Sequence, residues 1–169
     1  MSFNRSDLFL AEAAMNQMRN AIYFLARLME KKGNIDINER LRNMGRNIAR
    51  TFIKYWKPIE IVNVSNIKDV LQTIYQKIVN SSVSIEVNSD EKIIIIKDYK
   101  CSLCKYNYKD INIAGCEILL GLVSELIFLI NKELKDTSLI FLEPYKAEES
   151  RARGDNVCVQ FFKYKIGGP

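Results

Sequence analysis

Cysteines are the residues of this 169-residue chain best suited to chemistry. Three of the four fall within sixteen positions, in the segment CSLCKYNYKDINIAGC, and they are Cys101, Cys104 and Cys116, with Cys158 outside it. A Cys-x-x-Cys pair can be half of a metal site, a redox couple, or two small apolar residues in a core. A chain of this length buries a core without disulfide bonds, so the clustering is informative.

The chain contains no histidine, which narrows the chemistry further. Any metal must be held by thiolates and carboxylates, and Ser-His or Cys-His catalysis is excluded. The sequence also lacks a Gly-rich phosphate loop and a nucleophile motif, and no two carboxylates are spaced as an acid–base pair. Enzymatic activity therefore has little support, although the sequence leaves it open.

Two amphipathic helices are expected before the cysteines. After an N-cap at Ser6, one heptad seam runs to Gly33 and consists of Leu8, Ala11, Met15, Met18, Ile22, Leu25 and Met29. The second helix is predicted from Asp36 to a residue before Pro58, and Gly45 in its middle indicates the close approach of another backbone. A seam about 40 Å long needs a partner helix, so we expect a homodimer.

The remaining elements alternate between helix and sheet. We expect a helix from Asn66 through Ile78, a hairpin over 83–87 and 92–99, an apolar helix over 113–134, and strands over 138–145 and 157–166. Gly115 and Gly121 in the apolar helix are expected to allow its close approach to the sheet. This order predicts a single α+β domain over residues 1–169, with a helical dimerisation part (1–58) and an α/β part (59–169). The sheet is expected to be four-stranded and mostly antiparallel, with the long helix inserted between strands 2 and 3.

Several stretches together resemble the vinyl-4-reductase domain family, which is similar in fold to the vesicle-tethering subunits of the transport-particle (TRAPP) complexes. They are RNMGRNIARTF, IAGCEILLGLVSEL, a strand that ends in Glu143, and a Gly-Asp turn followed by VCVQF. The resemblance implies a metal held by a cysteine that begins the long helix, a glutamate that ends the next strand, a cysteine three residues later and a cysteine in the last strand. Cys116, Glu143 and Cys158 match three of these positions, and Lys146 stands at the remaining one.

A structural zinc ion needs four ligands, and Cys101 and Cys104 can replace the missing one. We therefore predict a zinc site of four thiolates, with Glu143 as an alternate ligand or as a hydrogen-bond acceptor behind the ligands. Two alternatives stay open. Cys116 and Cys158 can be ordinary buried thiols beside a solvent-facing pair, or Cys101 and Cys104 can form a redox couple.

The resemblance implies a binding module for small apolar molecules. On the long helix, Leu119, Leu122 and Leu126 are the candidates for lining such a pocket. The alternative is a protein–protein scaffolding subunit without a small ligand. A weaker alternative is a basic nucleic-acid-binding protein, since Arg42, Arg46 and Arg50 form a basic stripe suited to anions. Such a stripe is more often a solvated helix face, and it lacks interleaved aromatic residues, so nucleic acid is not expected.

The distribution of charge, the N-terminal sequence and the longest apolar stretch bear on where the protein is expected to be located. Through Pro58 the chain has 11 basic and 5 acidic residues, or +6, which leaves −1 for the rest of the total of +5. The N-terminus lacks the pattern of a secretory signal, and the apolar stretch from Ile118 to Ile130 is interrupted by Ser124 and Glu125. We expect a cytoplasmic protein without a membrane span.

Overall fold

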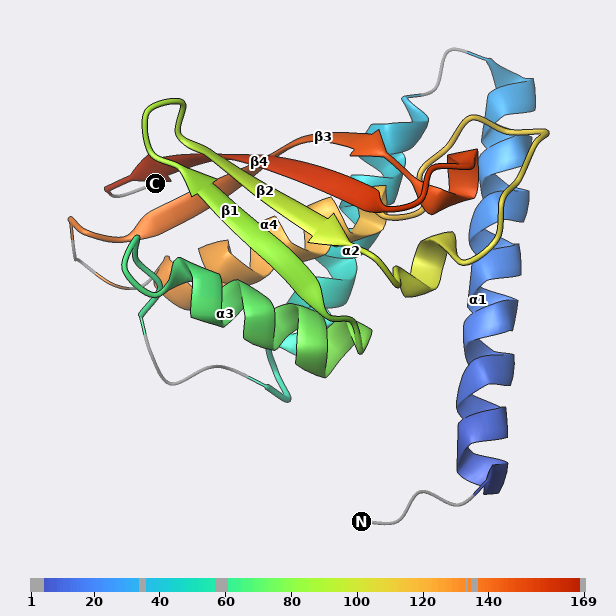
Figure 1. Ribbon diagram of the computed structural model, residues 1–169, viewed down its shortest axis with the longest axis horizontal. Helices are drawn as coiled ribbons and strands as arrows, with labels where there is room; N and C mark the ends of the chain where they lie inside the picture. Colours follow the sequence, from blue (N-terminus) through green and yellow to red (C-terminus); the bar gives the residue numbers. More distant parts are fainter. Residues whose placement is uncertain (1–4, 34–35, 57–60, 133, 135–136, 168–169) are drawn as a thin grey trace.

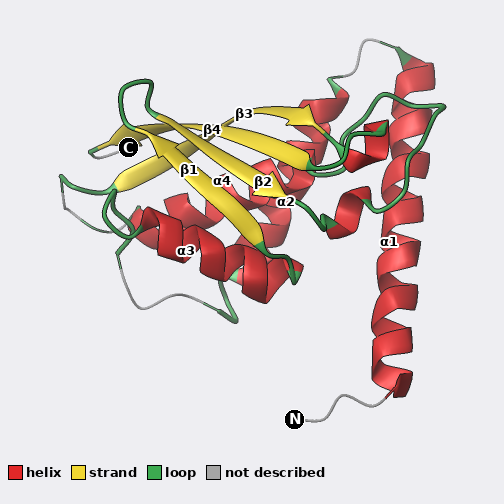
Figure 2. Cartoon of the chain, viewed as in Figure 1, coloured by secondary structure: helices red, strands yellow, loops and turns green. Residues whose placement is uncertain are grey.

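The computed structural model describes residues 5–33, 36–56, 61–132, 134 and 137–167, with side chains from residue 9 onward. Three layers of elements can be followed in Figures 1 and 2. In chain order they are α1 (Arg5–Lys32), α2 (Ile37–Phe52), α3 (Ile67–Ile74), a π-helical turn (Tyr75–Val79), β1 (Val83–Asn88), β2 (Ile93–Asp98), a 3₁₀ turn (Ser102–Cys104), α4 (Glu117–Asn131), β3 (Ile140–Glu149), a second 3₁₀ turn (Arg151–Arg153) and β4 (Cys158–Ile166).

The sheet has the strand order β1-β2-β4-β3, and every neighbouring pair is antiparallel. This confirms the α+β class, the four-stranded sheet and the helix between strands 2 and 3. Side chains alternate across the sheet. Ile94, Ile96 and Phe162 are fully buried on the face that α3 and α4 cover, whereas Ile93 and Ile95 are half-buried on the other face.

Helix α2 packs on α4 behind the sheet, and two glycines allow the contact. A Cβ atom on Gly45 would lie 2.0 Å from the carbonyl oxygen of Ile118, and one on Gly121 would lie 2.0 Å from that of Arg42. Gly45 therefore does mark the close approach of another backbone, as expected, but that backbone is α4 of the same chain. Gly121 approaches α2, and not the sheet as its place in the apolar helix had suggested.

Helix α1 stands at one end of the molecule, against the segment between β2 and α4 (Figure 1). It ends at Gly33, as predicted, where φ is +65°. Ser6 lies within the helix and is not its N-cap. Its expected seam is divided between two sides, because Ile22 is buried while Met18 and Leu25 are exposed. The side chain of Leu8 lies outside the described residues.

The starts of the other helices agree with the expected boundaries to different degrees. Asp36 caps α2 as predicted, since its Oδ1 accepts a hydrogen bond from the Glu39 amide at 3.0 Å. Asn66 does not cap α3 with its side chain, which instead bonds the backbone of Asn63 and Ile61. Helix α4 begins at Glu117, four residues later than expected.

Within the described residues, no helix is both long and apolar enough to span a membrane.

Candidate metal centre

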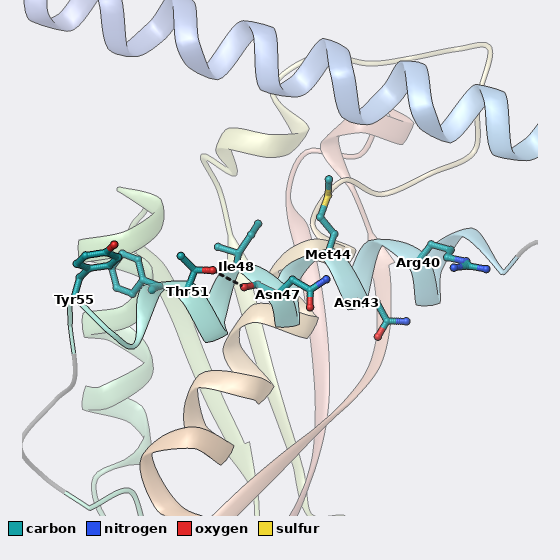
Figure 3. Close-up of a pocket in the computed structure, with 8 residues that line it drawn as sticks. Arg40, Asn43, Met44, Asn47, Ile48, Thr51 and Tyr55 are labelled. Carbon is teal, nitrogen blue, oxygen red and sulfur yellow. Dashed lines mark hydrogen bonds between the residues drawn. The ribbon is translucent and has the colours of Figure 1, made fainter.

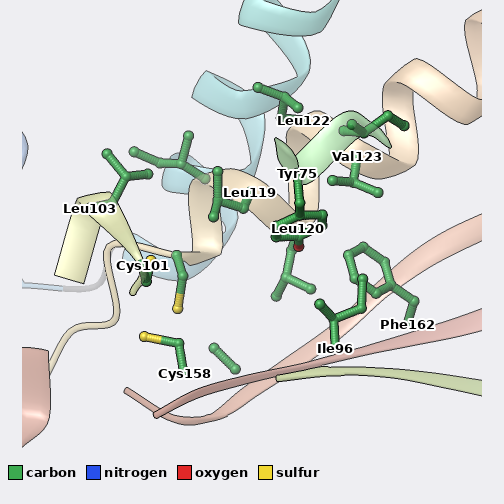
Figure 4. Packing of buried hydrophobic residues seen from close by; sticks show 14 of the residues in the cluster. Tyr75, Ile96, Cys101, Leu103, Leu119, Leu120, Leu122, Val123, Cys158 and Phe162 are labelled. Atoms are coloured by element: carbon green, nitrogen blue, oxygen red, sulfur yellow. The ribbon is translucent and has the colours of Figure 1, made fainter. Parts of the chain in front are cut away.

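Three cysteine sulfurs meet in the core at one end of the sheet. The Sγ atoms of Cys101, Cys104 and Cys158 all lie within 4.8 Å of one another, and the three side chains are fully buried. Cys101 follows β2, Cys104 ends the first 3₁₀ turn, and Cys158 opens β4 directly across from Asp98. Figure 4 shows Cys101 and Cys158 close together beside the leucines of α4.

Cys116 completes the group from a third direction. It occupies the position before the first residue of α4 and is fully buried. It does not belong to the compact triplet, but it lies close enough to Cys101, Cys104 and Cys158 for these thiols to raise its pKa. The structure thus brings together all four cysteines that the sequence analysis selected.

The four thiols are electrostatically unequal. Hydrogen bonds, first from Cys101 and then from Cys116 and Cys158, hold the pKa of Cys104 well below its usual range. The same hydrogen bonding raises the pKa of Cys116, with burial adding to the effect, and the bond to Cys104 does the same for Cys101. The Arg151 amide also points at the Cys158 sulfur, 3.4 Å away. Cys104 is therefore the thiol that the group most readily holds as a thiolate.

This donor set suits a structural zinc ion. Zinc–sulfur bonds of about 2.3 Å at tetrahedral angles place ligand sulfurs about 3.8 Å apart, a separation that falls within the 4.8 Å limit on the triplet. An ion here would link the end of β2, the start of α4 and the start of β4. Redox chemistry fits less well, because reactive thiols need solvent access and all four are buried.

Asp98 belongs to the same neighbourhood, although the sequence analysis did not select it. Its side chain is fully buried and accepts hydrogen bonds from the Ser81 hydroxyl and the Lys100 amide. Burial raises the pKa of this carboxyl. Its Oδ2 atom has no hydrogen-bond partner in the described part of the chain. The signal that could have identified Asp98 in the sequence is an acidic residue at the end of a strand with four consecutive isoleucines.

Tyr23 of α1 is the second residue that the sequence analysis missed. Its hydroxyl accepts a hydrogen bond from the Gly115 amide at 3.0 Å and donates one to the Cys104 sulfur at 3.8 Å. Its ring stacks on Tyr108 at a centroid distance of 3.9 Å. Burial, followed by the charge of Cys104, raises the pKa of Tyr23. The tyrosine lies outside the expected heptad seam, so periodicity alone did not select it.

Arg19 fastens α1 to the same segment. Its side chain is 2% exposed, and Nη1 donates to the Ser102 carbonyl at 2.9 Å while Nη2 bonds Glu12 and Asn16 at 2.8 Å. Arg27 adds an ion pair with Asp110 further along the helix. The first helix is therefore attached mainly through the segment that carries three of the cysteines.

Glu143 lies apart from the cysteines. It is exposed on β3, directly across from Lys163 of β4, and pairs with Lys165 at 3.7 Å. Lys146, which stands where the resembled family has a cysteine, pairs with Glu148 at 2.7 Å on the surface. The structure brings neither residue to the metal centre, because both lie several residues along the strands from Cys158.

The expected basic stripe consists of residues engaged within the chain. Each arginine forms an ion pair at 2.7 Å: Arg42 with Glu117, Arg46 with Glu39, and Arg50 with Glu125. The pair between Arg42 and Glu117 is largely buried, and Glu117 also accepts a hydrogen bond from the Ala147 amide at 3.3 Å. Arg42 and Arg50 hold α2 against α4 and β3, and the pair of Arg46 lies within α2. All three arginines are thus engaged within the chain, so the geometry does not support an anion-binding role for them.

The three leucines proposed for a ligand pocket are buried core residues. Leu119 and Leu122 are each 3% exposed and Leu126 is fully buried. A groove of about 780 Å³ lies elsewhere, on the outer face of α2, where it extends from Arg40 to Tyr55 (Figure 3). Its apolar lining includes Met44 and Ile48, and none of the three leucines contributes to it.

Comparison with known proteins relates the chain to others through its fold. No family model matches the sequence, and no curated protein matches it. Among solved structures, the chain is similar to a trafficking protein particle complex subunit 3 from Naegleria fowleri, solved covalently bound to palmitic acid. The match has a TM-score of 0.64 and 13% sequence identity, and it covers 93% of this chain and 98% of the other. The chain therefore has a fold of the TRAPP-subunit type.

Proposed function

We propose that the protein is a non-catalytic scaffolding subunit whose fold is held by a structural zinc ion. Cys101, Cys104, Cys116 and Cys158 are the proposed ligands. The observation that carries this proposal is the convergence of four buried cysteines from three separate segments, with an acidic Cys104 among them. A cytoplasmic location, where thiols stay reduced, is part of the proposal.

The scaffolding role is supported by where the apolar surface lies. The α4 leucines are packed in the core, whereas large apolar side chains of α1 and α2 are exposed, among them Phe24, Leu25 and Ile48. Exposed apolar surface of this extent is typical of a protein–protein contact. The fold is shared with a protein named as a subunit of a complex. In this proposal residues 1–58 form the contact part of a single domain, and 59–169 form its α/β part.

Metal analysis tests the zinc centre. Protein purified without chelator should contain about one zinc ion per chain, and removing the ion should lower the melting temperature. Cys104→Ser should lose the ion, while Ser84→Ala, on the exposed edge of β1, should retain it. A preparation that never met a chelator and holds no metal would show that the cysteines are core thiols.

A small apolar ligand is the second candidate. It is favoured by the apolar α2 groove, by the resemblance to the vinyl-4-reductase domains, and by the palmitic acid bound to the protein of similar fold. A guest that binds only the folded state stabilises it by about 2.7 kcal/mol at a hundredfold excess over Kd. Aromatic hydrocarbons, fatty acids and isoprenoids should therefore include one that raises the melting temperature.

Single substitutions test whether such a ligand binds in the α2 groove. Ile48→Glu would put a charge into the α2 groove and should abolish the shift, whereas Glu86→Gln, on exposed β1, should not. Gly121→Leu cannot serve as a cavity-filling variant, because Gly121 contacts the backbone of Arg42. A panel that produces no shift would remove the ligand hypothesis and leave the scaffolding role.

A further inference from the structure

Two sides of α1 differ in their surroundings. One side faces the rest of the chain and buries Arg19, Ile22, Tyr23 and Ala26. A second side, roughly a third of a turn away at 3.6 residues per turn, is exposed. We call it the outer stripe, and it consists of Ala11, Ala14, Met18, Ala21, Leu25 and Leu28.

The outer stripe has the spacing of a helix–helix contact. Its members are separated alternately by three and four residues, which is the a/d pattern of a coiled coil over nearly three heptads. All six are apolar and uncharged. The pattern differs from the seam expected from sequence, which included Met15 and Ile22, because Ile22 belongs to the core of the chain and Met15 packs against that core. A free helix face of this kind is suited to a second helix.

The exposed area is large enough for a stable partner. Leu10 and Phe24 flank the outer stripe and are each 65% exposed. Met44 and Ile48 of α2 point toward the side along which α1 passes (Figure 3). The exposed parts of these side chains and of the stripe come to roughly 800 Å², which is the area one partner contributes to a standard interface.

The order of side-chain sizes along the stripe determines the direction of pairing. Small residues occupy its N-terminal part, with Ala11 and Ala14, and large residues occupy its C-terminal part, with Leu25 and Leu28. A parallel copy would set alanine against alanine and leucine against leucine, which leaves gaps at one end and crowding at the other. An antiparallel copy sets each small residue against a large one.

We propose that α1 pairs with α1 of a second copy of this chain, antiparallel, about a two-fold axis near Met18 and Ala21. The facing pairs are Ala11 with Leu28, Ala14 with Leu25, and Met18 with Ala21. Such an interface is closed, since the same surface serves both chains. This inference rests on the proposed scaffolding role and specifies its partner.

Light scattering coupled to size exclusion tests the pairing. The wild-type chain at micromolar concentration should have about twice the chain mass of 19.6 kDa. Ala14→Glu alone and Leu25→Lys alone should each yield a monomer, because each buries an unpaired charge. The double variant should dimerise again, because the antiparallel arrangement sets opposite charges against each other. In a parallel pair the double variant sets like charges together and stays monomeric.

Asn20→Lys is the matched control, because Asn20 is exposed on α1 outside the stripe. It should remain dimeric. Circular dichroism and zinc content, measured on every variant, separate loss of pairing from loss of the fold.

A folded, zinc-loaded wild-type monomer would overturn the pairing and leave a scaffolding subunit that binds another chain. Dimers that persist in both single variants, or a double variant that stays monomeric, would equally overturn it. A wild-type dimer without metal would instead overturn the proposed zinc centre and leave the pairing standing.

Discussion

The two N-terminal helices are both amphipathic, yet they are held in different ways. Helix α2 is embedded, with backbone against backbone at Gly45 and with arginines paired to α4 carboxylates. Helix α1 is attached along one side through Arg19, Tyr23 and Arg27, all to the segment that contains the cysteines. An apolar periodicity therefore indicates that a helix has a partner, but not whether that partner lies in the same chain.

The largest expected difference between α1 and α2 comes from adding a large side chain to each helix. In Gly45→Leu the new side chain would begin 2.0 Å from the Ile118 carbonyl oxygen, so the two helices must move apart. We expect a loss of at least about 3 kcal/mol in the free energy of unfolding, measured by denaturant titration, or failure to fold. Asn20→Leu on exposed α1 should stay within about 0.5 kcal/mol of wild type. Equal losses would contradict the assigned packing.

Removing a buried charge should have the next largest effect. Glu117→Gln leaves the Arg42 guanidinium, which is 17% exposed, without its carboxylate. Breaking a buried pair by removing one partner costs about 3 kcal/mol. Arg50→Gln breaks a pair whose arginine is 59% exposed, and such pairs contribute less than about 1 kcal/mol. Similar values for the two variants would mean that Glu117 does not anchor α2.

A charge on either side of α1 distinguishes attachment from pairing. Ile22→Glu places a carboxylate at a position that is 3% exposed, and it should detach α1 from the cysteine segment. Hydrogen exchange should then show lost protection along α1. Leu25→Glu, at a position 45% exposed, should separate the copies and leave the attachment of each α1 to its own chain intact. Lost attachment in both variants would refute the two-sided assignment of α1.

The smallest expected effect comes from one hydroxyl. Tyr23→Phe keeps the ring stacked on Tyr108 but leaves the buried Gly115 amide without an acceptor. We expect a loss of about 1 kcal/mol in stability and weaker zinc retention in competition with a chelator. Tyr106→Phe, which alters a half-exposed ring near Arg19, is the control. Unchanged retention in Tyr23→Phe would limit the tyrosine to packing.

Most of the fold follows from local rules. Asp36 and Gly33 fixed helix ends correctly, and the change from a helical to an alternating pattern located β1 and β2. The family resemblance implied that Cys116 and Cys158 belong to one site, and the strand order places Cys158 beside the end of β2, near Cys101 and Cys104. Helix ends and strand positions depend on residues that are neighbours in sequence, and the grouping of Cys116 with Cys158 depends on the topology of the family that the chain resembles.

Other features depend on tertiary partners that no local pattern contains. Glu143 was assigned to the centre by its place at a strand end, but β3 continues to Glu149 and carries it away. Gly121 was expected to face the sheet, because a helix pattern does not specify which neighbour a glycine admits. Asp98 and Tyr23 could be identified as neighbours of the cysteines only from the positions of the sulfur atoms in the structure.

The hydrogen bond between Tyr23 and Cys104 has a thermodynamic consequence. Binding effects between two sites are reciprocal, so whatever affinity for an ion the docked α1 confers on the cysteines, a bound ion returns to the docking of α1. Since α1 also presents the outer stripe, the occupancy of a buried centre would be felt at an exposed surface on the other side of the helix. Zinc supply would then regulate assembly without any ion lying at the interface.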